Sequence, residues 1–489
     1  MSLKKTPKTQ HTTIRNSAVV KTINQTISSP WGIGILGLLT FFAFAFSLEV
    51  EFYTFVVLYA IYVAIFADDF SPLIPLFPLC YITPSTINNP GKSEQGLFYG
   101  SSGLYLVGIV YVGVMILLLR IALDENFGFR RLFTMKRTML VGMLALGTSY
   151  FLSGIAHEQY LEYAKGNLLF AFIQFASVFL LYFIFSATIK WDRFDIEYFA
   201  WVGLIVGLVV AAEVGYIYWT QNVIVDGVIV RYNISSGWGC YNNIGAMIST
   251  SIPFAFYFAC RKKNNWAFIA LACFLLLAVI ASNSRGSMVG AVFSFVVGFI
   301  YTCIKCNNKK QLRLVSCILF CALAMGILIF REQLATIFRD LPGIISVDKE
   351  STVIHDSDRL NIYKNGIEVF LRNPIFGQTF YPIEYDIYSF SEVAKFNSFF
   401  PERWHNTIVQ MLASCGAVGM IAYAYHRFDT IRLYVKKRTL FNTYTFLFIL
   451  TLLLMSLLDC HFFNVGPVFL YSTGLAVMEF GQENRKNIA

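Results

Sequence analysis

The sequence predicts an all-α polytopic membrane protein, a bundle of about 12 to 14 helices that span a bilayer, with one large loop outside it. Three observations predict it. Of the 489 residues, 56% are hydrophobic and 14% are charged, whereas an average soluble domain carries about 25% charged residues. Apolar runs of roughly 17 to 23 residues, enough to cross about 30 Å of hydrocarbon, recur from Trp31 to Phe480. The basic residues between these runs are concentrated in alternate connecting segments, as expected if those segments lie on one side of the membrane.

Fourteen apolar segments can be outlined. Each is expected to be a helix, because backbone polar groups in hydrocarbon must be satisfied within the segment. The third segment is short and contains Pro72, Pro75 and Pro78, which favours a re-entrant or interfacial piece over a regular span. The segments are 31–48, 51–67, 71–83, 102–121, 138–156, 168–189, 197–219, 243–260, 266–282, 286–303, 314–330, 405–426, 439–458 and 462–480.

The distribution of charge sets the expected topology. The net charge is +9, and with the N-terminus inside, 26 of the 38 Lys and Arg residues fall in cytoplasmic segments. This asymmetry is typical of the positive-inside rule, so the basic runs are expected to anchor the chain at the inner leaflet and not to bind nucleic acid. No cleavable signal peptide is expected, because the first 30 residues are polar and basic.

This topology divides the chain into five parts. They are a cytoplasmic tail at 1–30, transmembrane helices at 31–330, an extracytoplasmic loop at 331–404, transmembrane helices at 405–480 and a cytoplasmic tail at 481–489. Within the loop, residues 359–371 predict a helix that ends before Asn373-Pro374. Its apolar face is expected to comprise Leu360, Tyr363, Ile367 and Phe370.

Three polar groups of residues converge on the outer face. The first is Ser282-Asn-Ser-Arg-Gly286, a tight turn between two spans. Arg285 is either a snorkelling side chain at a helix end or, with Ser284 and the N–H groups of a helix start, part of a phosphate site. The second is Asp358-Arg359, at the start of the loop helix.

The third group is Trp404-His405-Asn406, followed after nine residues by Gly416-Ala-Val-Gly419. A His that opens a membrane helix is either structural or, because its imidazole titrates near neutral pH, a general base. The two glycines leave a smooth surface for close packing.

These motifs, in this order and on this side, resemble the O-antigen ligase and polymerase superfamily. The resemblance covers Asn242 to Phe469 and rests on Ser282-Asn-Ser-Arg-Gly286, Ser357-Asp-Arg-Leu-Asn361 with Asn373-Pro-Ile-Phe-Gly377, and His405-Asn-x9-Gly416-x-x-Gly419, the last of which is closest to the ligases. One departure is Gln378-Thr379, where the family often has a second glycine after Gly377.

The resemblance implies a GT-C-like glycosyltransferase in the bacterial inner membrane, with its active site facing the periplasm. The donor would be a glycan on undecaprenyl pyrophosphate, transferred with inversion to an acceptor hydroxyl such as that of lipid A-core, without a metal or other cofactor. His405 would be the base, and Arg285 and Arg359 would hold the pyrophosphate, with Ser284, Asn406, Asp358 and Asn242 in support. Membrane lipids are the other expected partner.

Other polar residues have two interpretations each. Asp356-Ser-Asp358 resembles a metal-binding DxD motif, although helix capping is favoured. Glu213 is either functional or structural. Asp459 and His461 either support the site or end a helix. Asp68-Asp69 falls on the inner side, away from the expected chemistry.

Four other functions stay open. A polymerase or a protein O-oligosaccharyltransferase would share the donor and differ in the acceptor. A lipid-linked sugar transporter would instead place charges along a path at the midplane, whereas the polar groups gather at one face. A membrane scaffold would not need Arg and His residues on the donor side.

Overall fold

The computed structural model describes residues 17–80, 135–156, 170–225, 228–230, 233–236, 239–262, 265–306, 359–380, 404–463 and 465–482, with isolated residues between these ranges. Over these residues the chain is overwhelmingly helical, which confirms the all-α membrane fold. Five described helices are long and apolar enough to cross a membrane, or six if the bent pair α2 and α3 forms one span. The predicted total of 12 to 14 spans includes segments outside the described residues and stays a prediction.

The chain divides into two compact units, and α2, α3, α4, α5 and α11 belong to the first. Helices α3 and α11 pack together, and Gly37 allows their approach, since a Cβ there would lie 2.9 Å from Cγ2 of Ile205. The bounds are α2 (Ala18–Ile27), α3 (Pro30–Phe46), α4 (Glu49–Phe66), the 3₁₀ turn η1 (Ser71–Leu73), α5 (Leu76–Cys80), α10 (Leu181–Thr188) and α11 (Ile196–Thr220). Helix α10 begins in the second unit and continues into the first at Ile184. The proline-rich third segment is therefore broken into two short pieces.

Two small antiparallel hairpins lie between α11 and α12. They pair β1 (Ile224–Val225) with β2 (Val228–Ile229), and β3 (Ser235–Ser236) with β4 (Gly239–Cys240). No hydropathy pattern predicted these strands, because two residues are too short for an alternating pattern to be recognised.

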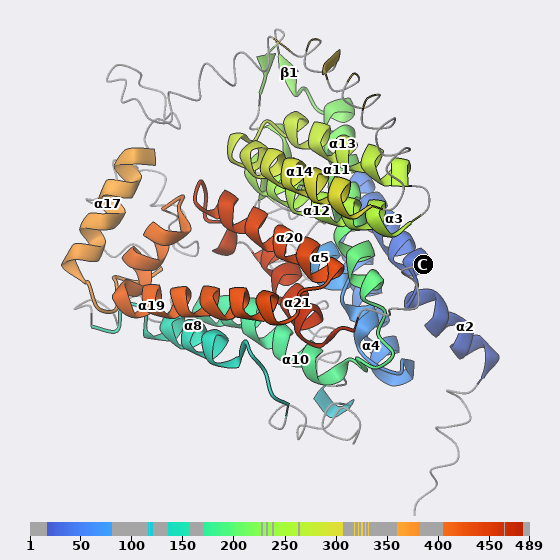
Figure 1. Ribbon diagram of the computed structural model, residues 1–489, viewed down its shortest axis with the longest axis horizontal. Helices are drawn as coiled ribbons and strands as arrows, with labels where there is room; N and C mark the ends of the chain where they lie inside the picture. Colours follow the sequence, from blue (N-terminus) through green and yellow to red (C-terminus); the bar gives the residue numbers. More distant parts are fainter. Residues whose placement is uncertain are drawn as a thin grey trace, which may run out of the picture. The chain divides into compact units, whose positions relative to one another are not determined.

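The second unit holds the other helices (Figure 1). Helix α12 is buried along nearly its whole length and packs against α13, α14 and α20. Helices α8 and α19 run side by side. The bounds are α8 (Leu140–Leu152), the π-helical turn η4 (Ala176–Leu180), α12 (Tyr241–Arg261), α13 (Asn265–Ala281), α14 (Arg285–Lys305), α17 (Arg359–Arg372), α19 (Thr407–Lys436), α20 (Leu440–Ser456), η9 (His461–Phe463) and α21 (Val465–Phe480).

Helix α19 continues ten residues past the predicted end of its segment at 426. The basic residue Arg427, which the charge count had placed in a cytoplasmic segment, lies within this helix. Its guanidinium carbon lies 4.3 Å from the ring centre of Phe462 and 4.5 Å from that of Tyr423. Contacts of a guanidinium with aromatic faces offset the loss of water around the charge. The predicted segment ended too early because a hydropathy scale treats Arg427 as a hydrated charge and takes no account of its contacts with aromatic rings.

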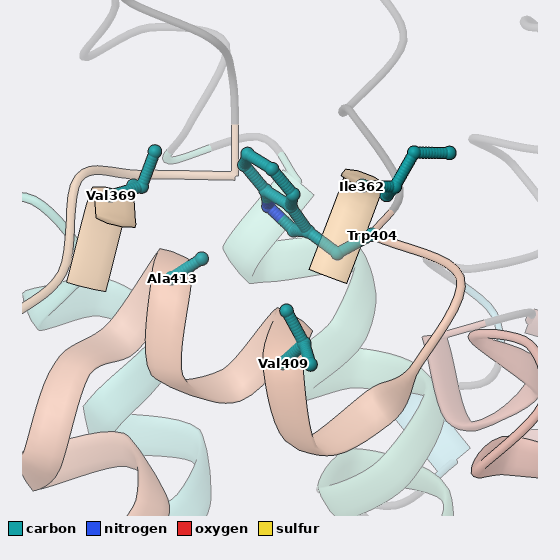
Figure 2. Close-up of a cluster of buried hydrophobic side chains, with 5 residues drawn as sticks. All are labelled: Ile362, Val369, Trp404, Val409 and Ala413. Carbon is teal, nitrogen blue, oxygen red and sulfur yellow. The ribbon is translucent and has the colours of Figure 1, made fainter. Parts of the chain in front are cut away.

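The predicted loop helix is present as α17, but the predicted apolar face is only partly correct, since Tyr363 and Phe370 are half-buried. The buried residues are Ile362, Gly366 and Val369, whereas Leu360 and Ile367 are exposed. Ile362 and Val369 form a cluster with Trp404, Val409 and Ala413, in which the Trp404 indole lies between α17 and the first turns of α19 (Figure 2). Gly366 sets which face of α17 packs against α19, because a Cβ there would lie 2.4 Å from Cγ1 of Val409. An apolar pattern does not count glycine as a contact residue.

Candidate active site

The predicted site residues of the second unit gather around one short turn. This turn, residues 457–460, follows α20 and precedes η9. It is contacted by the starts of α12, α14, α17 and α19, which bring Asn242, Gly286, Arg359 and His405 to it. The three motifs that the sequence separates by up to 120 residues therefore meet in one place.

His405 pairs with Asp459. Nδ1 of the imidazole lies 3.2 Å from Oδ1 of the carboxylate. The His405 side chain is 38% exposed, whereas that of Asp459 is 11% exposed. An ionised carboxylate only accepts hydrogen bonds, so Nδ1 is the donor, and in the neutral imidazole the lone pair is then on Nε2. The pair thus orients a half-exposed imidazole with a basic nitrogen available to a substrate proton.

The environment keeps Asp459 ionised. Burial by itself raises the pKa of this carboxyl, but the hydrogen bond with His405 and the electrostatic attraction of His461, His405 and Arg359 outweigh burial. The pKa of Asp459 therefore lies well below its ordinary value. Asp459 also accepts a hydrogen bond from the backbone N–H of Cys460 at 2.7 Å. The sequence left the roles of Asp459 and His461 open, and the structure places Asp459 at the centre of the site with buried His461 beside it.

Asn242 and Ser284 hold the second oxygen of the carboxylate. Nδ2 of Asn242 donates to Oδ2 of Asp459 at 3.1 Å, and Oδ1 of Asn242 accepts from Oγ of Ser284 at 3.0 Å. Ser284 is also the N-cap of α14, where its Oγ accepts from the N–H of Ser287. The chain of hydrogen bonds therefore runs from the first turn of α14 through α12 to the His405–Asp459 pair.

Two arginines flank this pair. Nη1 of Arg359, the first residue of α17, donates to the carbonyl of Leu458 at 2.6 Å. Arg285 is the first residue of α14 and is half-buried. Its neighbour Gly286 lies against the same turn, because a Cβ at Gly286 would lie 3.4 Å from Cβ of Leu458. Both arginines are therefore the first residues of helices that begin near this turn.

Three helix N-termini converge with these side chains. Helices α14 and α17 begin at the two arginines, and α19 begins directly after His405 and its N-cap Asn406. The N-terminus of a helix carries partial positive charge and exposed N–H groups. Together with two guanidinium groups, this arrangement favours an anion such as a diphosphate.

The backbone at His405 is held by its neighbours. His405 has φ of +47°, in the left-handed region that side chains other than glycine rarely adopt. Its carbonyl accepts a hydrogen bond from the hydroxyl of Tyr363 at 3.1 Å. Asn406 caps α19 through the N–H groups of Ile408 and Val409, and donates to the carbonyl of Leu457 at 2.8 Å. Tyr363 thereby links α17 to His405, a contact that the sequence alone did not indicate.

Two glycines of the motifs, Gly377 and Gly416, lie at a break in α19. Gly416 has φ of +64° and interrupts the helix, so its neighbours lose their partners within the helix. The segment after α17 replaces them: Ala417 N–H donates to the carbonyl of Pro374 at 2.8 Å, and Val418 N–H to that of Ile375 at 3.1 Å. Gly377 fits here because a Cβ would lie 2.4 Å from the carbonyl carbon of Ser414. The motif thus fixes the loop helix to the membrane helix that carries His405.

Thr379 is one of the two residues, Gln378 and Thr379, that stand where a second glycine was expected from the family resemblance. Its φ is +150°, which is unusual for a residue with a Cβ. The departure from the family pattern therefore leaves the backbone in a conformation that suits glycine.

Some predicted residues are not part of this arrangement. Asp358 and Asp356 lie outside the described residues, so their roles stay predictions. Glu213 is buried in α11, in the other unit. Among the residues that the structure describes, no group of three or more His, Cys, Asp or Glu side chains is placed to hold a metal ion.

Comparison with known proteins agrees with the sequence resemblance. Residues 268–424 match the family model described as O-antigen ligase. The match includes Arg285, Arg359, His405 and Gly416, whereas Asn242 and Asp459 lie outside it. No curated protein matches the chain. The resemblance to the O-antigen ligase superfamily is thereby confirmed.

Proposed function

We propose that this chain, an O-antigen ligase-like membrane protein, transfers a glycan from polyprenyl pyrophosphate to an acceptor hydroxyl at the outer face of the inner membrane. The observation that supports it best is the His405–Asp459 pair beside a turn that Arg359 contacts and against which Gly286, the neighbour of Arg285, lies. The best acceptor class is a lipid-anchored saccharide such as lipid A-core. The donor lipid is undecaprenyl pyrophosphate, the carrier that the family resemblance implies.

The base and the leaving group use different residues. Nε2 of His405 accepts the proton of the acceptor hydroxyl while that oxygen bonds to the anomeric carbon from the side opposite the pyrophosphate. The bond between the anomeric carbon and the pyrophosphate oxygen breaks, and its electron pair leaves with the pyrophosphate. The carbon is inverted. Asp459 stabilises the imidazolium that forms, because its carboxylate faces Nδ1.

Arg285 and Arg359 stabilise the charge that gathers on the departing pyrophosphate. Stabilisation at this point lowers the barrier, since the charge is larger in the transition state than in the bound donor. A planar guanidinium can donate two parallel hydrogen bonds to a phosphate, which an ammonium cannot. The role of the general base therefore falls on His405, and stabilisation of the leaving group falls on the two arginines.

The test is transfer of a labelled glycan in membranes at matched expression. His405→Ala should lower transfer about 10²- to 10⁴-fold while the donor still binds. Arg285→Lys should be strongly impaired although it keeps the charge, and Arg359→Ala should weaken both donor binding and transfer. Arg372→Ala, an exposed position in the last turn of α17, is the matched control. Near-normal transfer by His405→Ala would refute the base, and near-normal transfer by both arginine variants would refute the pyrophosphate site.

The acceptor is distinguished in the same assay. Label in lipid A-core supports a ligase, label in longer lipid-linked chains supports a polymerase, and label on Ser or Thr of a protein supports a protein O-oligosaccharyltransferase. Movement of label across the membrane without a new bond would support a transporter and overturn the proposal.

A further inference from the structure

A polar cleft lies in the first unit, on segments that the proposed reaction does not use. It has a volume of about 560 Å³ and is lined by α2, the turn after α4 and the turn before α11. Ligand sites commonly have volumes of about 300–1,000 Å³. The residues that matter to the argument are Lys21, Asn24, Asp68, Asp69, Lys190 and Arg193.

Hydrogen bonds between distant segments hold the walls of the cleft. Nδ2 of Asn24 in α2 donates to the carbonyl of Phe66 at 3.0 Å. The hydroxyl of Tyr198 in α11 donates to the carbonyl of Ile27 at 3.1 Å. The N–H of Lys190 donates to Oδ2 of Asp69 at 3.1 Å. These hydrogen bonds connect α2, the turn after α4 and the segment at the start of α11 to one another, so the protein itself holds the cleft in shape.

The cleft lies at one end of the membrane helices of this unit. Helix α3 begins beside it at Pro30, α4 ends at Phe66 and α11 begins at Ile196. Helix α2 meets α3 at an angle of 72°, as expected for an amphipathic helix that lies in the membrane surface.

Exposed apolar side chains beside the cleft support this placement. Val19 and Trp31 are 68% and 81% exposed, and Ile23 is also exposed. Trp is enriched at the boundary between lipid and water. The cleft therefore opens where phospholipid headgroups lie.

The charges of the cleft are balanced. Three basic residues, Lys21, Lys190 and Arg193, face three acidic ones, Asp68, Asp69 and Asp195. Both oxygens of Asp69 accept hydrogen bonds within the protein, Oδ1 from Ser71 and Oδ2 from the Lys190 N–H. Asp195 caps α11 through the N–H of Glu197. Asp68 is exposed and is the acidic group best placed to meet a ligand.

We infer that this cleft binds the headgroup of a zwitterionic phospholipid with a primary ammonium, of the phosphatidylethanolamine class. Lys21 and Lys190 bind the phosphate, and Asp68 accepts a hydrogen bond from the ammonium. A headgroup with only negative charge would offer no hydrogen-bond donor to Asp68. A trimethylated ammonium would keep the charge but has no N–H to donate. The inference is independent of the proposed transferase function.

The experiment measures lipid bound to the purified full-length chain by native mass spectrometry. The probes are phosphatidylethanolamine, phosphatidylcholine and phosphatidylglycerol with identical acyl chains. The wild-type chain should retain phosphatidylethanolamine about tenfold better than phosphatidylcholine, the effect of one charge-assisted hydrogen bond. Asp68→Asn should remove this preference, whereas Lys21→Gln should weaken binding of both lipids.

The control is Lys262→Gln, a basic residue after α12 that does not line the cleft, and it should leave binding unchanged. Lys21 and Asp68 are both exposed, so their variants should fold, which elution as a single species checks. Equal retention of phosphatidylethanolamine and phosphatidylcholine would overturn the inference. So would a preference for phosphatidylglycerol, which would indicate a site for anionic lipid, or an unchanged preference in Asp68→Asn.

Discussion

The guanidinium of Arg359 donates a hydrogen bond to the carbonyl of Leu458 at 2.6 Å, one residue before Asp459, whose carboxylate faces His405. Through this contact the loop helix α17 reaches the turn that positions the proposed base. The arginine proposed to hold the leaving group and the histidine proposed to accept the proton are therefore coupled to the same turn. A change in that turn should therefore affect both proton transfer to His405 and departure of the pyrophosphate.

Asp459→Asn should lower transfer about 10²-fold or more, because a neutral amide neither fixes the tautomer of His405 nor stabilises its protonated form. Donor binding should change little. Transfer of labelled glycan and binding of unreacted donor are measured separately on the same membranes. Glu368→Gln, an exposed position on α17, is the control. Transfer close to that of the wild type would show that the pair has no part in the reaction.

Asn242 should act through Asp459. Asn242→Ala removes the hydrogen bond to Oδ2 of the carboxylate, and transfer should fall about tenfold, the effect of one bond to a charged group. In the Asp459→Asn background the same substitution should have a much smaller effect, since residues of one network are not additive. The measurement is transfer by the wild type, both single variants and the double variant. Additive losses would contradict coupling between Asn242 and Asp459.

Gly416→Ala should destabilise the protein. A Cβ at this position would lie 2.4 Å from the carbonyl oxygen of Ile375, and φ is +64°, so about 1–3 kcal/mol of backbone strain is added to the clash. Thermal unfolding in detergent should shift to lower temperature. Gly34→Ala is the control, because a Cβ there meets no atom within 4 Å. Equal unfolding temperatures for the two variants would show that the close contact between Gly416 and the segment at Ile375 does not stabilise the protein.

The reaction should not need a divalent metal. Two guanidinium groups and three helix N-termini supply the positive charge that a metal supplies in other transferases. Purified protein with lipid-linked donor and acceptor should therefore turn over in excess chelator. If activity is lost and magnesium or manganese restores it, Asp356 and Asp358 become the candidate ligands and the arginine mechanism is wrong.

The loop 331–404 and the C-terminal tail should lie on opposite sides of the membrane. The uneven distribution of basic residues places the loop outside and the tail inside. Fusions of a sidedness reporter after Asp348 and after Gln482 test this directly. If both report the same side, the predicted topology fails, and the outer location of the proposed active site fails with it.

The sequence by itself predicted most of the helices that the structure describes, although not α2, and it named residues that are candidates for chemistry. Hydropathy over a single segment depends on local composition, and the described helices begin and end close to the predicted bounds for α12, α13 and α14. Arg285, Arg359 and His405 could be named because they lie in three motifs that resemble the O-antigen ligase superfamily.

Only the tertiary structure decided how these pieces meet. Asp459 is 54 residues from His405, and no local pattern distinguishes an acid that pairs from an acid that ends a helix. The rotation of α17 depends on the close approach at Gly366, and the bend of α19 depends on hydrogen bonds from the segment at Pro374 and Ile375. Each of these is a contact between segments far apart in the chain. Packing sets such contacts, and hydropathy does not encode them.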